Sequence, residues 1–216
     1  MPRALRSGAV AGALLAPALT LALACGASAV SGASRCAPHG ARSLARSRSV
    51  RVYSLGSSSA FAQRTYACLL RSGATVRLRG QASGPDSLSN FALAESVLGY
   101  SDYSFGVDSG CTSITVLDVA HRRNLRALPQ VACTVDAGFI RLGTVSGLVV
   151  TPRGSVAWIA STGRHGAESF EVRAAQASAP AQLLDQGPAI APGSLRIAGS
   201  EVSWQDGGQR RTAKLR

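Results

Sequence analysis

Short β-type runs separated by turn residues are the feature that most constrains this chain. Between Gly147 and Gly187, four such runs are divided by a Pro-Arg-Gly turn, a Gly-rich loop and an Ala/Ser/Pro loop. This pattern predicts a four-stranded antiparallel meander. Because no long segment keeps a hydrophobic period near 3.6, we expect few helices and an all-β fold.

Weaker copies of this unit fill most of the chain. We expect strands at residues 50–53, 64–70 and 75–79 in a first unit, and at 91–93, 98–101, 113–118 and 125–128 in a second. A fourth unit has expected strands at 194–197, 201–204 and 211–215, and it ends one strand short. Residues 131–143 are interpreted as an insertion. Residues 87–96 are interpreted as strand rather than helix, because apolar residues alternate with alanine there.

A local signature of an aliphatic, a small and an aromatic residue recurs in the second strand of these units. It is present as Leu98-Gly99-Tyr100, Val156-Ala157-Trp158 and Val202-Ser203-Trp204, with Tyr53 as a degenerate first copy. The aromatic residues are 47, 58 and 46 positions apart. A period in the forties built from four strands is typical of a β-propeller blade. We therefore expect a small or partial β-propeller made of antiparallel four-stranded meanders, with a β-sandwich as the alternative, and we expect Tyr100, Trp158 and Trp204 to pack between blades.

The hairpin from Ile114 to Leu128 has Asp118 between its strand and its turn. It resembles the strand–Asp–turn–strand hairpin of WD40-like and TolB-like propeller repeats. Residues 50–215 as a whole resemble uncharacterised exported actinobacterial proteins with such repeats. The Gly-His dipeptide and Trp-Asp ending of true WD40 repeats are absent from the chain. The resemblance implies a propeller and no particular activity, since propellers carry many functions.

The N-terminal region has the layout of a secretory signal peptide. Arg3 and Arg6 precede an apolar run of 15 residues, Val10–Ala24, and Ala27-Ser-Ala29 forms a cleavage site. We assign residues 1–29 to the signal peptide, 30–49 to a flexible leader and 50–216 to the propeller-like domain. A retained membrane anchor is the less favoured alternative, because a spanning helix needs roughly 20 apolar residues. Ala22-Leu-Ala24 before Cys25 partly resembles a lipoprotein signal, so lipidation of Cys25 is an alternative to soluble export.

Four cysteines follow the signal peptide: Cys36, Cys68, Cys111 and Cys133. An even number of cysteines in an exported chain indicates disulfides. Closeness along the chain favours Cys36–Cys68 and Cys111–Cys133 among the three possible pairings, with four independent thiols as the alternative. No Cys-x-x-Cys spacing points to zinc or redox chemistry.

Several catalytic chemistries lack their sequence signature. There is no Gly-x-Ser-x-Gly nucleophile elbow, and the three histidines, His39, His121 and His165, are far apart. We therefore assign no catalytic residue, cofactor or metal. Asp102 and Asp108 are the acids that a glycosidase-type or calcium site would use.

The net charge is +12, and 22 of the 23 basic residues are arginine. These arginines are scattered without a basic motif interleaved with aromatic residues, which argues against nucleic acid as a partner. A basic exported protein is instead attracted to anionic lipid headgroups or wall polymers. The sequence thus favours a non-enzymatic binding or scaffold module of the cell envelope or extracellular space, with a protein or envelope polymer as partner. The alternative is a secreted propeller-type hydrolase or lyase that uses acids such as Asp102 and Asp108. A catalytic propeller predicts acidic residues gathered at one mouth, whereas a binding module predicts a broad apolar or basic loop face.

Overall fold

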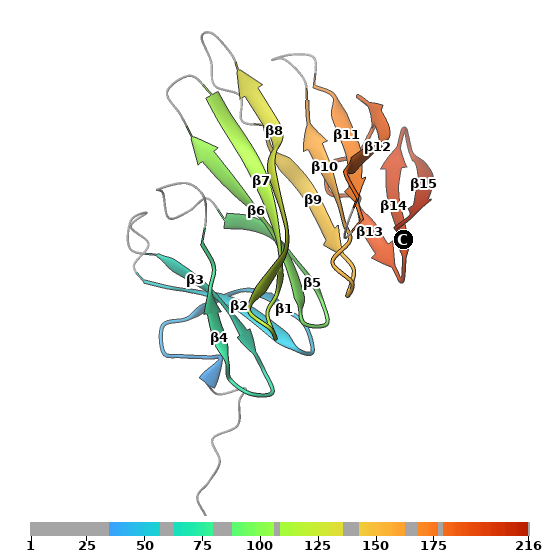
Figure 1. Cartoon of the computed structure of the whole chain (residues 1–216). Helices are drawn as coiled ribbons and strands as arrows, with labels where there is room; N and C mark the ends of the chain where they lie inside the picture. The colour runs from blue at the N-terminus through green and yellow to red at the C-terminus, as the bar shows by residue number, and fades with distance from the viewer. Residues whose placement is uncertain are drawn as a thin grey trace, which may run out of the picture.

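The computed structural model describes residues 35–56, 63–79, 88–105, 109–135, 143–162, 168–176 and 179–215. The residues assigned to a signal peptide, Cys25 and Asp108 lie outside these ranges. The strands of the described residues form four antiparallel sheets (Figure 1). The first sheet contains β1 (Arg42–Arg46), β2 (Val50–Leu55), β3 (Arg64–Leu69) and β4 (Thr75–Arg77). The second contains β5 (Leu88–Ala94), β6 (Val97–Phe105), β7 (Ser109–Asp118) and β8 (Arg123–Val135).

The third sheet contains β9 (Val145–Val150), β10 (Val156–Ser161), β11 (Phe170–Ala175) and β12 (Ala181–Gly187). The fourth contains only β13 (Arg196–Ala198), β14 (Glu201–Asp206) and β15 (Gln209–Lys214). In every sheet the strands pair in chain order, so each sheet is a simple meander. The expectation of an all-β fold of antiparallel meanders is therefore confirmed. The choice of strand over helix for residues 87–96 is also confirmed, since β5 covers most of that segment.

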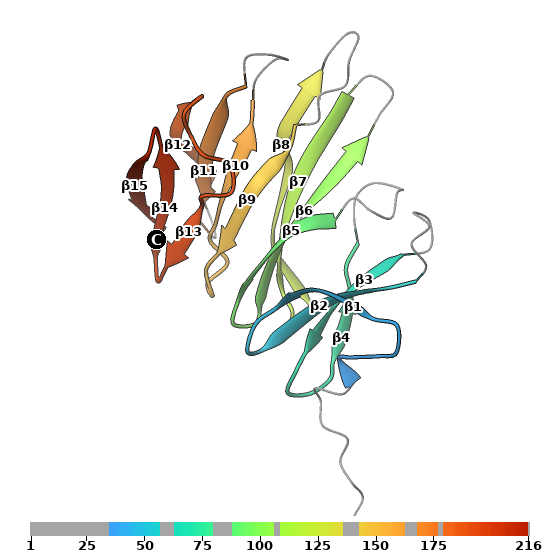
Figure 2. The ribbon, with the colours of Figure 1, turned by 180° about the vertical axis from the view of Figure 1, so that it is seen from behind.

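The four sheets follow one another in a row (Figures 1 and 2). The first strand of each sheet contacts the first strand of the next: β1 lies against β5, β5 against β9, and β9 against β13. The second and third sheets thus each present one face to the sheet before and the other face to the sheet after, whereas the first and fourth sheets each have one outermost face.

An apolar cluster fills each of the three seams between neighbouring sheets. The first seam contains Val50, Val52, Ala67, Leu98 and Tyr100, and the second contains Val97, Ile114, Val150, Val156 and Trp158. The third contains Ala157, Ile159, Val172, Val202 and Trp204. Alternation along each second strand explains this division, because neighbouring residues point to opposite faces of a sheet. Trp158 faces the second sheet, for example, while Ala157 faces the fourth.

The small residue of the repeated signature allows the sheets to approach closely. A Cβ atom added at Gly99 would lie 2.5 Å from Cγ1 of Val150 on β9. The aromatic residue after it packs in the preceding seam: Tyr100, Trp158 and Trp204 have exposed fractions of only 5, 1 and 4 %. Tyr53 on β2 has the same orientation and stacks on Tyr66, with ring centroids 5.5 Å apart.

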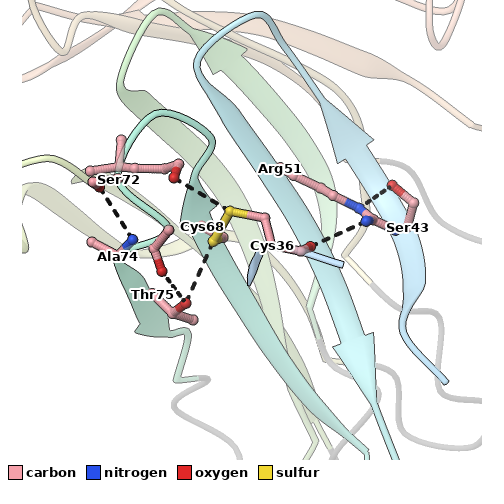
Figure 3. The surroundings of a disulfide bond; sticks show 9 residues. Cys36, Ser43, Arg51, Cys68, Ser72, Ala74 and Thr75 are labelled. Atoms are coloured by element: carbon pink, nitrogen blue, oxygen red, sulfur yellow. Dashed lines mark hydrogen bonds between the residues drawn. A yellow bond between two sulfur atoms is a disulfide. The ribbon is translucent and has the colours of Figure 1, made fainter. Parts of the chain in front are cut away.

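The two outermost faces of the row are covered in different ways. On the first sheet, the Cys36–Cys68 disulfide holds the segment before β1 against the face that carries Tyr53 and Tyr66 (Figure 3). Arg51 fixes this segment further, because its guanidinium donates to the carbonyl oxygen of Cys36 at 3.1 Å.

The register places polar and small side chains on the outer face of the fourth sheet. These residues are Arg196, Ala198, Glu201, Ser203, Gln205, Arg210, Thr212 and Lys214. A polar outer face is what a terminal unit of a stacked array requires for solubility. Neither end of the row therefore presents a large apolar face.

Two expectations about the strands need correction. Residues 42–46, assigned to a flexible leader, form β1 and pair with β2, so the first strand begins at Arg42 rather than Val50. Residues 131–135, assigned to an insertion, belong to β8 and pair with β7. Among the described residues, the first strand of the chain, β1, does not complete the fourth sheet. It pairs in the first sheet instead, and the fourth sheet has three strands among the described residues.

Candidate functional site

The tight turns of the four sheets gather at one end of the row, the lower end in Figure 1. They connect the first strand to the second, or the third to the fourth, and the end of β15 lies with them (Figure 2). We call this end the turn end and define it by residues 46–49, 70–74, 95–96, 119–123, 151–155, 199–200 and 214–215.

Short-range hydrogen bonds fix the backbone of the turn end. In the β9–β10 turn, the amide of Gly154 donates to the carbonyl oxygen of Thr151 at 3.0 Å, and the amide of Ser155 donates to the Thr151 hydroxyl oxygen at 3.1 Å. Pro152 favours this turn because its ring fixes φ at the first central position. Gly154 has a φ of +87°, which a residue with a side chain rarely adopts. The loop thus has a defined shape without any ligand.

Exposed basic side chains cover the turn end. They are Arg46, Arg48, Arg71, Arg122, Arg123, Arg153 and Lys214. None of these seven forms a salt bridge with another residue in the described part of the chain. Among the described residues, three carboxylates lie at or beside the turn end, those of Glu95, Asp118 and Glu201. The turn end is therefore a positively charged surface whose cations are free to meet an external anion.

Asp118 shapes the β7–β8 turn from which two of these arginines project. One carboxylate oxygen accepts from the amides of Ala120 and His121, at 3.1 and 3.3 Å. The other lies 2.6 Å from Nδ1 of the His121 ring. Partial burial acts to raise the pKa of Asp118, but the hydrogen bonds and the charge of His121 outweigh it, so the pKa lies below its ordinary value. Asp118 is therefore ionised at neutral pH, and its charge offsets part of the charge of the arginines in the same turn.

Arg122 in the same turn has an unusual backbone conformation. Its φ is +52°, in the left-handed region that favours glycine or asparagine. Glycine or asparagine would therefore be less strained than arginine at this position.

One arginine holds the second and third sheets together close to this surface. The guanidinium of Arg126 on β8 donates to the carbonyl oxygens of Gln176 and Ala179, which flank the β11–β12 connection. Because both acceptors belong to the neighbouring sheet, this side chain bridges the seam. The positions of the turns on either side are therefore coupled.

A groove opens at the turn end between the third and fourth sheets. Thr151, Pro152, Arg153 and Ser155 of the β9–β10 turn line one side. Gly199 and Ser200 of the β13–β14 turn, with Lys214 and Leu215, line the other. Its volume is about 590 Å³, which lies in the range of roughly 300–1,000 Å³ that is usual for small-molecule sites.

The structure has both disulfides that the sequence favours, Cys36–Cys68 and Cys111–Cys133, with Cα–Cα distances of 5.5 and 4.2 Å. The first joins the N-terminal segment to β3 beside the turn end. The second joins directly opposed residues of β7 and β8, toward the other end of the second sheet. The two disulfides are far from each other in the fold, so they form no common site.

The acids considered for catalysis are not brought together. Asp102 lies on β6 with an exposed fraction of 2 %, opposite Ser113 of β7. Asp108 lies outside the described residues. Within the described ranges, no group of three or more His, Cys, Asp or Glu side chains is arranged to hold a metal ion. The described residues also contain no helix long and apolar enough to cross a membrane.

Sequence reasoning missed the turn end as a surface. The seven basic residues lie between positions 46 and 214, and in a linear reading they look scattered. Their common property is position in or beside a hairpin turn that joins the first and second or the third and fourth strand of a sheet, or at the end of the last strand. That property becomes visible only when the strands are assigned to sheets correctly.

Comparison with protein-family models, with curated proteins and with solved structures gives no match to this chain.

Proposed function

We propose that this protein is an exported, non-enzymatic binding module that attaches to an anionic polymer of the cell envelope through its turn end. The observation that carries the proposal is the set of seven exposed cations on one end of the row, none of them in a salt bridge with a described residue. Several like charges on one surface raise the local concentration of an anionic partner through their summed field. Stability of the fold does not explain this cluster of cations, because unpaired like charges repel one another.

The remaining features support export and a passive role. Two disulfides are compatible with an oxidising compartment outside the cytoplasm, which agrees with a signal peptide at residues 1–29. The four meanders are blades of a partial propeller in this proposal, because their first strands lie side by side as inner strands of blades do. A covered outer face on the first sheet and a polar outer face on the fourth favour an open row over a ring completed by a second chain. Attachment through lipidated Cys25 would place the same surface close to the envelope.

The rival function, a hydrolase or lyase, has less support. A catalytic acid must reach the substrate within hydrogen-bond distance. Asp102 is almost completely buried within the second sheet, whereas most of the accessible charged groups of the turn end are basic. Arginine and lysine bind and position anions, but a general acid or base needs a pKa close to the working pH.

The proposal is tested by measuring the affinity for a soluble phosphodiester polymer, poly(glycerol phosphate), by isothermal titration calorimetry. Dextran serves as the uncharged control polymer. We expect binding to poly(glycerol phosphate) alone, with an affinity that falls as the salt concentration rises, because salt screens exposed charges.

Two double variants with the same change in net charge locate the surface. Arg122→Gln with Arg123→Gln removes two turn-end cations. Arg64→Gln with Arg210→Gln removes two exposed cations at the opposite end of their sheets. We expect the first pair to weaken binding about two- to tenfold, since one exposed charge pair contributes about 0.2–1 kcal/mol. The second pair should change the affinity less than twofold. Equal effects of the two pairs, or equal binding of dextran, would contradict the proposal.

A further inference from the structure

The fourth sheet ends on an open edge, because its outermost strand, β15, has no strand beyond it among the residues that the structure describes. The other three sheets have four strands each, and the fourth has three. In both ribbon views β15 lies at the margin of the row (Figures 1 and 2). Its side chains are exposed except that of Ala213, which is half-buried. A strand with one unpaired edge is a template for an added strand.

One hydrogen bond identifies the backbone groups that face this edge. The amide of Leu215 donates to the carbonyl oxygen of Ser200 at 2.7 Å, so the backbone of Leu215 is directed toward the β14 side. Backbone groups of successive residues in an antiparallel strand alternate between its two sides. Every second residue of β15, counted back from Leu215, therefore also faces β14. The amides and carbonyls that face the open edge are those of Arg210, Thr212 and Lys214.

The outer edges of the other sheets are interrupted, whereas that of β15 is regular. β4 has only three residues. The β7–β8 and β11–β12 ladders contain register shifts, and Pro129 lies within β8. In contrast, β14 and β15 pair over six consecutive residues without a shift. Short strands, bulges and proline protect an edge from pairing, and β15 has none of these three features.

The charge of β15 decides which strand it can accept. Arg210, Arg211 and Lys214 are its charged residues, and it contains no acid. The neighbouring strand offsets part of this charge, since Glu201 lies opposite Lys214 and a carboxylate oxygen of Asp206 lies 3.7 Å from the Arg211 guanidinium. A second copy of β15 would place cations against cations, which destabilises a strand pair, whereas an acidic strand would place carboxylates against them.

The two faces of an added strand would meet different surroundings. Ala213 faces the third seam and is only partly buried there, as is Leu184 on β12 of the wider third sheet. A side chain beside Ala213 on the added strand would extend this apolar seam, because adjacent strands share their faces. Side chains beside Arg210 and Lys214 would lie on the outer face of the fourth sheet. The edge thus favours acidic residues on the outer face and an apolar residue on the inner face.

We propose that β15 binds an extended acidic segment of a partner protein as an antiparallel fourth strand of the fourth sheet. The segment pairs with the backbone of Arg210, Thr212 and Lys214, and its carboxylates lie beside the cations of β15. In strand addition, main-chain hydrogen bonds give affinity and alternate side chains give specificity. The inference does not depend on the proposed function, because it is carried by backbone pairing along β15 and not by the turn end.

A synthetic peptide, acetyl-Glu-Val-Thr-Glu-Glu-Thr-amide, is the probe. In the proposed register its residues lie, in order, opposite Lys214, Ala213, Thr212, Arg211, Arg210 and Gln209. Two N-methylated forms with the same side chains and charge are the matched controls. Methylation of the first, third and fifth residues removes the amides that face β15, and methylation of the second, fourth and sixth removes those that face away. We expect the first form to bind at least about tenfold more weakly than the unmodified peptide, and the second within about twofold of it, because backbone hydrogen bonds are lost only in the first.

Titration of the ¹⁵N-labelled, oxidised protein followed by NMR measures these affinities and locates the peptide. The amides of Arg210, Thr212 and Lys214 should shift on binding and become protected from hydrogen exchange. Arg210→Glu should weaken binding about two- to tenfold, and Arg64→Glu, with the same change in charge on the first sheet, less than about twofold.

The outcomes separate strand addition from attraction to the basic surface. Equal binding of the two N-methylated forms would overturn backbone pairing. Shifts confined to residues 119–123 and 151–155, or no saturable binding of the unmodified peptide, would overturn the site on β15. Peptide binding at β15 by a protein that does not bind poly(glycerol phosphate) would leave this inference standing while the proposed function fails.

Discussion

The two tryptophans of the seams differ in one polar interaction, and replacing each by phenylalanine tests how the seams are built. Trp158 on β10 and Trp204 on β14 occupy equivalent positions, and both are almost fully buried. The indole nitrogen of Trp204 donates to the carboxylate of Asp185 on the neighbouring sheet at 2.7 Å. The indole nitrogen of Trp158 is buried and has no acceptor among the described residues.

The expected free-energy changes follow from this difference. Shrinking either indole to a phenyl ring leaves a small cavity that costs about 1–2 kcal/mol, less than the 3–5 kcal/mol of a change to alanine. At Trp158 the substitution also removes an unpaired buried donor, which by itself costs about 1–3 kcal/mol, so the net change should be close to zero. At Trp204 it removes a hydrogen bond to a charged group, worth about 1.5–3 kcal/mol. Trp204→Phe should therefore destabilise the protein by about 2 kcal/mol or more relative to Trp158→Phe.

Urea unfolding of the oxidised protein, followed by far-UV circular dichroism, measures both free energies of unfolding. The remaining tryptophan in each variant reports on its own seam by fluorescence, which shows whether the seams unfold together. Trp158→Ala provides the reference for complete loss of the side chain. Equal destabilisation by the two phenylalanine variants would refute the difference in polar pairing. A Trp158→Ala variant with unchanged stability would refute the seam itself.

Three further predictions concern the turns and the disulfides. Asp118→Asn should destabilise the protein by about 1–2 kcal/mol at neutral pH, because the charged acceptor of the turn is lost. Since the folded pKa of Asp118 is depressed, its contribution to stability is present above the ordinary value of 3.8 and disappears as pH falls through the lower folded value. The free energies of unfolding of the wild type and the variant should therefore converge in acid. Arg122→Asn should raise the free energy of unfolding by about 0.5–1 kcal/mol, because asparagine tolerates the left-handed conformation better than arginine does. The same variant should bind the polymer more weakly. An unchanged or lower stability in thermal denaturation would argue against backbone strain at this position. A mild dithiol should reduce Cys111–Cys133 before the disulfide of the first sheet, because Cys133 is exposed whereas Cys36 and Cys68 are fully buried. Alkylation followed by mass spectrometry measures the order of reduction. Simultaneous reduction of the two disulfides would contradict it.

The sequence was sufficient for the fold class and for most strands because the apolar pattern and the turn chemistry agree in the third unit. The triplet of an aliphatic, a small and an aromatic residue placed the second strand of three sheets correctly, and closeness along the chain favoured both disulfides. These features are local, and local rules are reliable where they agree with one another.

The missed strands depend on partners that a linear pattern does not contain. Residues 42–46 include only Leu44 and Ala45 as apolar residues, and they form a strand because β2 supplies partners for four of the five, on either side of an irregularity at Leu44. Residues 131–135 look like an insertion because Pro129 interrupts the alternation, yet they continue β8 beyond a bulge opposite β7. The turn-end surface can be recognised only from the order of the strands in each sheet together with the end of the sheet at which each turn lies.

The central claim is that the turn end is the surface that meets an anionic polymer. Hydrogen–deuterium exchange with and without poly(glycerol phosphate) measures this directly, because amides at a binding surface become protected. We predict protection concentrated in residues 46–49, 70–74, 119–123, 151–155 and 199–200, with the strands of the seams unchanged. Protection confined to the opposite end of the sheets, or none at saturating polymer, would contradict the claim.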